Sequence, residues 1–401
     1  MSDLRTAEGR STGCLGDLVE LVRDKHLPTP LDSDVPCINL EHIPEGAGRA
    51  LSWSKASENL SSKTKFQAGD ILFGKLRPYL RKYAQPQFSG VCTSELLAFR
   101  AKPGVDPRYA YHVVGLPEFS EYCVAASFGT KMPRTDWRTA SAFPVQIPDQ
   151  NEQRRIADLL SAMDAQIEVC TEQTAKLKVL RSGVVFEQLL PLADTSPSCS
   201  LGTLCEQVTS GSRGWASYYS EKGALFLRIG NLTREHPNLR FDDVVRVQVP
   251  EGGEGARTRL QEGDLLISIT ADLGIVASVP PGLGEAYVNQ HIALARLSDQ
   301  RVHPRWVAHA FASPFGSNQI ARLNDGGAKA GLNLPTIRAL RVPLPDLGQQ
   351  LRVVELIDSI DAQLEKEQAH LAKLKLQKQG LLSKLLTPPA QRQTTIVNHD
   401  Q

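Results

Sequence analysis

Lysine, arginine and tyrosine side chains are interleaved in one short run of this chain, a mixture that suits contact with nucleic acid. Two tyrosines lie among four cations, Lys75, Arg77, Arg81 and Lys82. Cations and backbone amides bind phosphate, and arginine also reads base edges in the major groove. The run follows a Gly-Asp turn and an apolar segment, 71–73, which indicates a buried strand. We therefore expect it in a loop at the edge of a domain.

Similar loops elsewhere add further candidate DNA contacts. They are Lys131, Arg134, Trp137, Arg213, Tyr218, Arg228, Asn231, Arg234 and Lys329. Each cluster alone is a weak signal, because solvated loops commonly carry such residues. The formal net charge of +1 also means that any basic patch must be offset by acidic surface elsewhere.

Motifs for catalysis and metal binding are missing from the sequence. It has no phosphate-binding P-loop, no dinucleotide-binding glycine motif, no His-Glu-x-x-His, no Gly-x-Ser-x-Gly and no Cys/His cluster with metal-ligand spacing. It also lacks the Pro-Pro-Tyr/Phe type of motif that amino-methylating enzymes use to hold a flipped base. His291 fits a satisfied structural histidine better than a catalytic one. The sequence therefore predicts no catalysis, no metal and no cofactor of its own.

Length and composition fit two ordinary globular domains. The 401 residues are 41% hydrophobic and 22% charged, without an apolar run long enough for a transmembrane helix or a signal-peptide core. Seven scattered cysteines with no Cys-x-x-Cys pair indicate reduced thiols rather than disulfides or a zinc site. We expect a cytoplasmic protein.

The chain contains an internal repeat. Pro148, Gln153 and Asp164 recur as Pro345, Gln350 and Asp361, each 197 residues later. Weaker matches extend through both preceding globular halves, with an offset that drifts from 186 to 197. The pattern is a divergent globular half followed by a constant helix, twice over.

Both constant segments carry an a/d heptad seam that needs a partner surface. The apolar seam residues are Ile156, Leu160, Met163, Ile167, Leu177, Val184, Val353, Ile357, Ile360, Leu364, Leu371, Leu374 and Leu381. Each helix should run about 35 to 40 residues and end near Pro191 or Pro388. The simplest arrangement is an antiparallel pair with pseudo-two-fold symmetry; the alternative is that each helix packs only on its own domain.

Arg181 and Lys378 occupy the same seam position in the two copies. A cation there can fix register and pairing, at a cost in stability. In the simpler interpretation each long stem only extends to solvent near a frayed helix end.

These patterns predict an α+β fold with two similar globular domains in tandem, each followed by a long helix. The expected segments are two globular domains, 1–147 and 191–344, the helices 148–190 and 345–387, and a disordered tail, 388–401.

The combined motifs resemble the specificity subunit of type I restriction-modification enzymes. The first resemblance is carried by Pro148, Glu152, Gln153, Ile156, Ala157, Leu160, Asp164 and Ile167, and the second by Gly69, Asp70, Ile71, Leu72, Phe73, Lys75, Arg77 and Pro78. The stretch 129–134, Gly-Thr-Lys-Met-Pro-Arg, also fits. The second copy lacks the Lys-x-Arg-Pro, which puts in doubt a transfer of the Lys75 and Arg77 roles to that half.

The resemblance implies a non-catalytic subunit. Two target recognition domains would each read one half of a split, asymmetric site in double-stranded DNA, and the helices would set the spacer. The helices would also dock two methyltransferase subunits, which bring S-adenosylmethionine, and through them translocase-nuclease subunits, which bring ATP and magnesium. The competing interpretations are a coiled-coil scaffold whose globular halves bind protein, and an enzyme with an unfamiliar motif.

Overall fold

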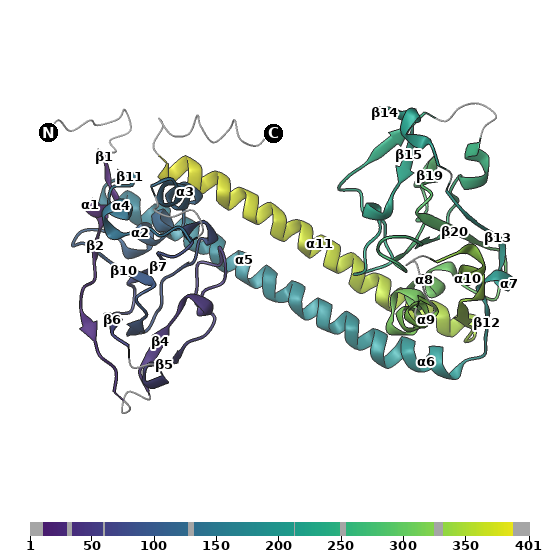
Figure 1. The fold of residues 1–401 in the computed structure, drawn as a ribbon, viewed down its shortest axis with the longest axis horizontal. Helices are drawn as coiled ribbons and strands as arrows, with labels where there is room; N and C mark the ends of the chain where they lie inside the picture. Colours follow the sequence, from purple (N-terminus) through teal and green to yellow (C-terminus); the bar gives the residue numbers. More distant parts are fainter. Residues whose placement is uncertain are drawn as a thin grey trace. The chain divides into compact units, whose positions relative to one another are not determined.

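The computed structural model describes residues 11–29, 34–58, 61–126, 132–211, 213–248, 254–324 and 332–387. The chain forms two compact units: unit 1 comprises Met1–Thr171 and Ala369–Gln401, and unit 2 comprises Glu172–Gln368. The long helices α5 (Gln150–Val184) and α11 (Leu347–Leu386), which are labelled in Figure 1, each have residues in both units. Each unit thus contains one globular half and a segment of both helices.

The central sheet of unit 1 is antiparallel and has four strands. In order across the sheet they are β2 (Val19–Leu21), β10 (Leu96–Ala101), β7 (Ile71–Gly74) and β8 (Tyr83–Ala84). All four residues of β7 are buried, as the apolar run predicted. The Gly-Asp turn before β7 is fixed by Asp70, which accepts two hydrogen bonds from Arg100, at 2.9 and 2.7 Å, and one from the backbone of Gln67.

A mixed sheet and a short ribbon complete the strands of unit 1. The mixed sheet has the order β3 (Lys25–His26), β6 (Lys63–Phe66), β9 (Gly90–Cys92), β4 (Pro36–Ile38) and β5 (Ser54–Lys55), and the ribbon pairs β1 (Ser11–Cys14) with β11 (Pro144–Ile147). β11 leads directly into α5, so the ribbon ties the start of the chain to the start of the helix.

Short helices cover the central sheet of unit 1. They are α1 (Leu15–Leu18), α2 (Pro107–Val114), α3 (Pro117–Ala125) and α4 (Trp137–Ser141), with 3-10 turns at Leu40–His42, Ala56–Glu58 and Pro78–Leu80. Their apolar faces join β7 and β10 in one core. The same core includes Ile156 and Leu160 of α5 and Leu386 at the end of α11. The two helix segments therefore run antiparallel within unit 1.

Unit 2 repeats this plan. Its central sheet has the order β13 (Cys205–Ser210), β20 (Ile292–Leu297), β17 (Leu265–Ser268) and β18 (Val276–Ser278). A two-stranded ribbon pairs β12 (Ser198–Ser200) with β21 (Arg341–Pro343). A further sheet has the order β14 (Tyr219–Ser220), β16 (Val245–Val247), β15 (Ala224–Leu227) and β19 (Ala286–Val288). Asp264 and Arg296 repeat the paired contact of the first unit, at 2.8 and 2.7 Å.

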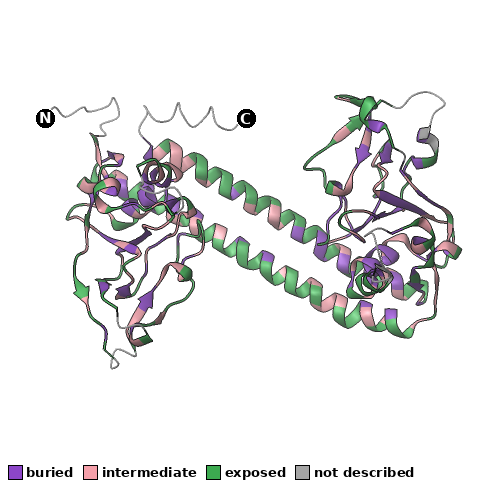
Figure 2. Cartoon of the chain, in the orientation of Figure 1, coloured by how far each residue is buried: buried purple, intermediate pink, exposed green. Residues whose placement is uncertain are grey.

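The helices of unit 2 pack on its central sheet and enclose a core of buried residues, which are purple in Figure 2. They are α7 (Leu201–Leu204), α8 (Pro304–Ala312), α9 (Pro314–Asn324) and α10 (Leu334–Ala339), with 3-10 turns at Trp215–Tyr218, Ile229–Asn231 and Glu254–Thr258. The core also includes Leu189, after α5, and Val353 and Ile357 of α11, so the helix segments are antiparallel here too.

The first long helix ends later than the sequence predicted. A π-turn at Val185–Leu189 follows α5, and α6 (Leu190–Thr195) continues past Pro191. A π-turn holds one residue more than an α-helical turn, so it can accommodate a proline that lacks a backbone donor. After Val184, the last apolar seam residue predicted for this helix, Leu189 is buried, whereas Gln188 is exposed. The second helix ends at Leu386, close to the predicted Pro388.

All the apolar residues predicted for the seam are buried or half-buried. The seven cysteines are free thiols, as expected. No helix in the described part of the chain is long and apolar enough to cross a membrane.

Candidate nucleic-acid interface

The basic loop predicted after β7 begins with Lys75 and is held by the segments on either side of it. The backbone N–H of Lys75 donates to Glu95 at 3.0 Å, and its carbonyl accepts from Thr135 at 2.9 Å. Arg77 adopts a left-handed conformation with φ 51°, which is rare for a residue with a side chain. Its side chain is exposed at the tip of the loop. Non-glycine residues in this conformation are concentrated at functional sites.

Two cations of the same run turn inward. Arg81 donates to the carbonyl of Gly115 at 2.9 Å, and Lys82 donates to the carbonyl of Leu40 at 2.8 Å. Both side chains are half-buried. In this structure they anchor the loop, whereas Arg77 is available at the surface.

Arg134 and Trp137, predicted from a separate loop, lie near Lys75. All three line one surface pocket of about 420 Å³. Arg134 is exposed and donates to both carboxylate oxygens of Glu95, at 3.0 and 3.1 Å. The ring of Trp137 packs on Phe99 with centroids 5.5 Å apart. One part of the half-buried Trp137 therefore contacts the core, and the other part faces solvent.

In unit 2 the candidates are more scattered. Arg213 and Tyr218 are exposed beside the buried ring of Trp215. Arg228 forms an ion pair with Asp243. Lys131 and Lys329 lie outside the described residues.

Asn231 is a structural residue rather than a surface one. It is 3% exposed, and its amide accepts from the backbone of Arg228 and donates to the carbonyls of Arg240 and Asp243, at 2.9 to 3.0 Å. Arg234 forms an ion pair with Asp272 and donates to the carbonyl of Leu273 at 2.8 Å. It therefore braces the loop that follows β17.

The seam cations are bound to carboxylates. Arg181 pairs with Asp361 in unit 2, and Lys378 pairs with Asp164 in unit 1. The prediction that these stems simply extend to solvent is wrong, because a buried or half-buried carboxylate stands opposite each one. Each pair joins α5 to α11 and selects their register.

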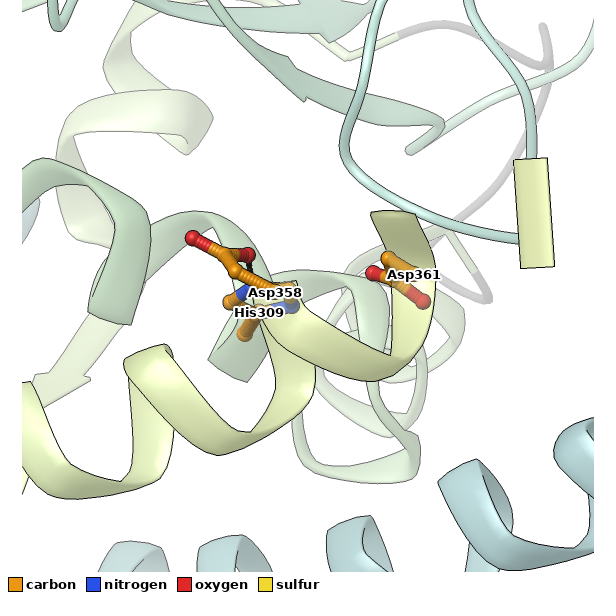
Figure 3. A group of neighbouring side chains, drawn as sticks. All are labelled: His309, Asp358 and Asp361. Carbon is orange, nitrogen blue, oxygen red and sulfur yellow. Dashed lines mark hydrogen bonds and ion pairs between the residues drawn. The ribbon is translucent and has the colours of Figure 1, made fainter. Parts of the chain in front are cut away.

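Beside Arg181, unit 2 contains a polar cluster of buried His309, half-buried Asp358 and buried Asp361, shown in Figure 3. His309 bonds to Asp358 at 2.6 Å, and Arg305 forms a paired contact with the same carboxylate. Burial would raise the pKa of Asp358, but the hydrogen bonds from His309 and Arg305 outweigh it and lower that pKa to about 2. Burial lowers the pKa of His309, which is therefore neutral at pH 7 and donates one N–H.

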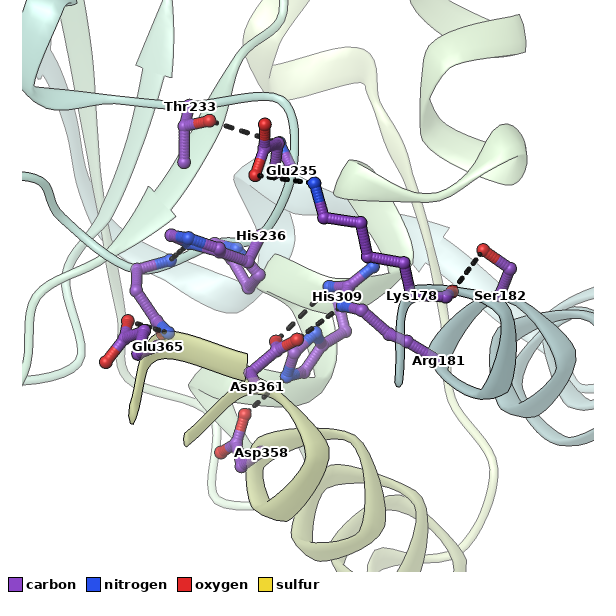
Figure 4. Close-up of polar contacts among 12 residues, drawn as sticks. Lys178, Arg181, Ser182, Thr233, Glu235, His236, His309, Asp358, Asp361 and Glu365 are labelled. Atoms are coloured by element: carbon purple, nitrogen blue, oxygen red, sulfur yellow. Dashed lines mark hydrogen bonds and ion pairs between the residues drawn. The ribbon is translucent and has the colours of Figure 1, made fainter. Parts of the chain in front are cut away.

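These three side chains have the ligand atoms for a metal ion, but their charge is already balanced. Two guanidinium groups, from Arg305 and Arg181, neutralise the two carboxylates, and Figure 4 shows Arg181 directed at Asp361. A divalent cation would have to displace both. The cluster is therefore a structural network that fixes α11 against α8 and the end of α5.

Two buried glutamines helped to define the repeat, but sequence reasoning gave them no structural role. Gln153 accepts from the backbone of Asp106 at 3.0 Å and donates to the carbonyl of Pro148 at 2.9 Å. Gln350 repeats both contacts with His303 and Pro345, at 2.8 and 2.9 Å. Their identical spacing from the preceding proline was the signal. They lock the start of each long helix to the globular half beside it.

Exposed apolar side chains also recur at equivalent helix positions. Leu159 and Leu356 are 44% and 45% exposed, and Val179 and Leu376 are 74% and 70% exposed. Each pair is separated by 197 residues, so each unit has one member of both pairs. The two units thus present equivalent apolar positions on their helix segments.

Comparison with known proteins agrees with this architecture. A family model described as the type I restriction modification DNA specificity domain matches residues 8–179 and 253–376. The specificity subunit of the type I restriction enzyme MjaVIII of Methanocaldococcus jannaschii is 19% identical, over 96% of this chain and 94% of its own length. That of the Escherichia coli enzyme EcoDI is 27% identical over 129 residues, 31% of this chain and 29% of its own.

Solved structures share the fold. The crystal structure of a type I restriction-modification S subunit from M. genitalium has a TM-score of 0.67 at 15% identity, covering 97% of this chain and 98% of that one. A chain from a study of complex assembly and conformational transition of the type I restriction-modification system has a TM-score of 0.51 at 19% identity, covering 94% and 97%. With the family model matching both halves, the chain belongs to the type I restriction-modification DNA specificity subunits.

Proposed function

We propose that this chain recognises a bipartite, asymmetric target in double-stranded DNA and supplies no catalysis of its own. The observation that carries the proposal is that two units with the same internal framework bear different side chains on it. The loop after β7 presents Arg77, where the loop after β17 presents Ala271. Equivalent backbones with unlike surface groups suit two readers of unlike half-sites.

Partner docking is the second part of the proposal. The exposed apolar positions on α5 and α11 occur in two equivalent sets, Leu159 with Leu376 and Leu356 with Val179. Exposed apolar residues that recur at equivalent positions in both units suit contact with a partner protein. Two equivalent sets suit two copies of one partner, a methyltransferase subunit. S-adenosylmethionine, ATP and magnesium would be bound by the partner subunits, with the translocase-nuclease subunits attached through the methyltransferase.

Selection from random duplex DNA tests the recognition. The chain, assembled with its methyltransferase partner, is incubated with the pool, and the bound DNA is sequenced. We expect a motif of two unlike half-sites with a fixed gap. Recovery of no motif from an intact assembly contradicts the proposal and favours a protein-binding scaffold.

Native mass spectrometry tests the docking. Leu159→Asp and Leu356→Asp should each reduce the number of bound methyltransferase subunits from two to one, and the double variant should bind none. Leu27→Asp is the matched control, because Leu27 is the same residue type and at least as exposed but lies outside both long helices. Full binding by the double variant would show that these leucines are not the docking surface.

A further inference from the structure

Both units build the same three-segment platform around the loop that follows the third strand of the central sheet. In unit 1 the backbone N–H of Lys75 donates to Glu95, and its carbonyl accepts from Thr135, at 3.0 and 2.9 Å. In unit 2 Ile269 makes the same two bonds with His291 and Leu332, at 2.9 and 3.0 Å. The three segments are far apart in sequence, so this match is a property of the fold.

The tip of the loop is strained at the same place in both units. Arg77 and Ala271 each stand two residues beyond the anchored residue, and their φ values are 51° and 58°. Within the described residues, the remaining non-glycine residue with positive φ is Arg81. A left-handed conformation costs about 1 kcal/mol or more for a residue with a side chain. The same conformation occurs at residues of different type, Arg77 and Ala271, which indicates that the shape of the loop has a functional role.

The groups around the tip differ between the units. Unit 1 has a guanidinium at the tip and the Arg134–Glu95 ion pair beside it. Unit 2 has neutral hydrogen-bonding side chains instead. Thr270 Oγ1 lies 2.7 Å from Nδ1 of His291, and Nε2 of Gln290 lies 2.9 Å from its Nε2.

The chemistry of these three linked residues fixes the direction of each bond. An amide nitrogen only donates, so Nε2 of His291 accepts from Gln290. The proton of the ring is then on Nδ1, which donates to Thr270. The hydroxyl proton of Thr270 is left to donate elsewhere, and among the described residues none donates a hydrogen bond to Oε1 of Gln290. The platform therefore offers one oriented donor and one oriented acceptor, separated by an imidazole ring.

The charged side chain of this loop is paired. Asp272, in the same loop, is paired with Arg234. Ala271, between Thr270 and Asp272, is exposed, so the tip is open to a ligand. Neutral donors and acceptors at an open, rigid surface suit base edges better than phosphates.

We infer that this platform is the base-reading surface of unit 2, with Thr270 and Gln290 as specificity-determining residues and His291 as the residue that positions them. The inference rests on the proposed function. Thr270 donates to a ring nitrogen or carbonyl acceptor, and Gln290 accepts from the exocyclic amino group of adenine or cytosine. Because the imidazole separates them, the two groups contact different base pairs.

The test uses the whole assembly and compares the motifs selected by four variants. Thr270→Val and Gln290→Leu should each lower the preference at one base pair of one half-site by about tenfold, a typical effect of removing a single hydrogen bond to a base. The other half-site should be unchanged. The salt dependence of binding should also be unchanged, because neither side chain binds phosphate.

Two further variants separate positioning from loss of folding. His291→Phe should lower the base preference at the same two base pairs that the Thr270 and Gln290 variants affect. The amide hydrogens of unit 2 should stay protected from exchange. Thr203→Val is the matched control, an exposed threonine outside the platform. If the wild-type assembly selects a bipartite motif that Thr270→Val and Gln290→Leu leave unchanged, this inference is wrong although the proposed function stands. If the wild type selects no motif, the proposed function itself fails.

Discussion

The guanidinium of Arg181, on α5, is bound to the carboxylate of Asp361, on α11, and that carboxylate is 1% exposed. The equivalent contact in unit 1, Lys378 with Asp164, uses a more accessible carboxylate, 34% exposed in its side chain. The repeat therefore places the same kind of ion pair in two environments. Burial decides how much each ion pair contributes to stability. Removing one partner leaves an unsolvated charge only where water cannot reach the other partner.

Arg181→Ala should destabilise unit 2 by about 3 to 5 kcal/mol, because it leaves Asp361 buried without a partner. Hydrogen exchange of unit 2 measures the loss. Lys378→Ala is the internal control and should cost clearly less, since water can solvate Asp164. Equal losses for the two variants would mean that burial does not control these pairs.

The stability of unit 1 should decrease as the pH is lowered, because of His112 in α2. Burial, followed by the nearby charges of Lys378 and Arg108, lowers the pKa of His112 to about 3. The unfolded chain, with the ordinary value near 6.5, therefore binds a proton that the folded chain does not between pH 6.5 and 3. Stability is present above pH 6.5 and is lost as pH falls, at about 1.4 kcal/mol per pH unit for this group.

Hydrogen exchange of unit 1 between pH 7 and pH 5 measures this dependence. His112→Asn keeps a polar group near Ser161, 3.3 Å from the imidazole, and cannot take up a proton in this range. The variant should show a shallower loss of protection than the wild type. An unchanged pH slope would show that His112 does not titrate with folding.

The loop after β7 should bind phosphate. Lys75→Ala combined with Arg77→Ala should weaken DNA binding and reduce the slope of affinity against salt by about one unit for each phosphate group that the variant no longer binds. Titration at several salt concentrations gives the slope. Lys55→Ala, an exposed lysine of the same unit, should leave it unchanged. A double variant with the wild-type slope would place these cations away from the DNA backbone.

Ala271→Gly should stabilise unit 2 by about 1 kcal/mol, because glycine adopts a φ of 58° without steric cost. Thermal or denaturant unfolding of the variant measures the gain. Ala216→Gly, in an ordinary 3-10 turn, should give no gain. A loss of stability at position 271 would mean that the methyl group of Ala271 contributes packing that outweighs the strain.

The length of the long helices should determine the gap in the DNA target. Four residues inserted after Thr174, with four inserted at its equivalent, Leu371, lengthen each helix by about 6 Å. Selection of bound DNA should then return the same half-sites with a longer gap. The same half-sites with an unchanged gap would show that the helices do not set the spacing.

The helices and their seam were predictable because a heptad pattern is a local property that the chain repeats. The strands 71–74 and 265–268 were predictable for the same reason, as apolar runs after a Gly-Asp turn. The π-turn at Val185–Leu189 was not, because no motif distinguishes one inserted residue from a helix end at Pro191.

The site was predictable only in part. The sequence singled out Arg77 and Arg134 by their type, but type could not show that Arg81 and Lys82 turn inward or that Asn231 is buried. Those outcomes depend on distant carbonyl groups, such as those of Gly115 and Leu40, that only the fold brings close. His291 was interpreted as structural, and its contacts with Thr270 and Gln290 show why its role could not be read from its neighbours alone.

The division of the helices between the units has a consequence for synthesis on the ribosome. Unit 2 is one continuous stretch, Glu172–Gln368, and all of it has been translated before the last turns of α11 exist. The core of unit 1 includes Leu386, so its packing is completed only when the end of that helix has emerged. Domains usually mature in the order of translation. Here the half that is made first is the last to finish folding.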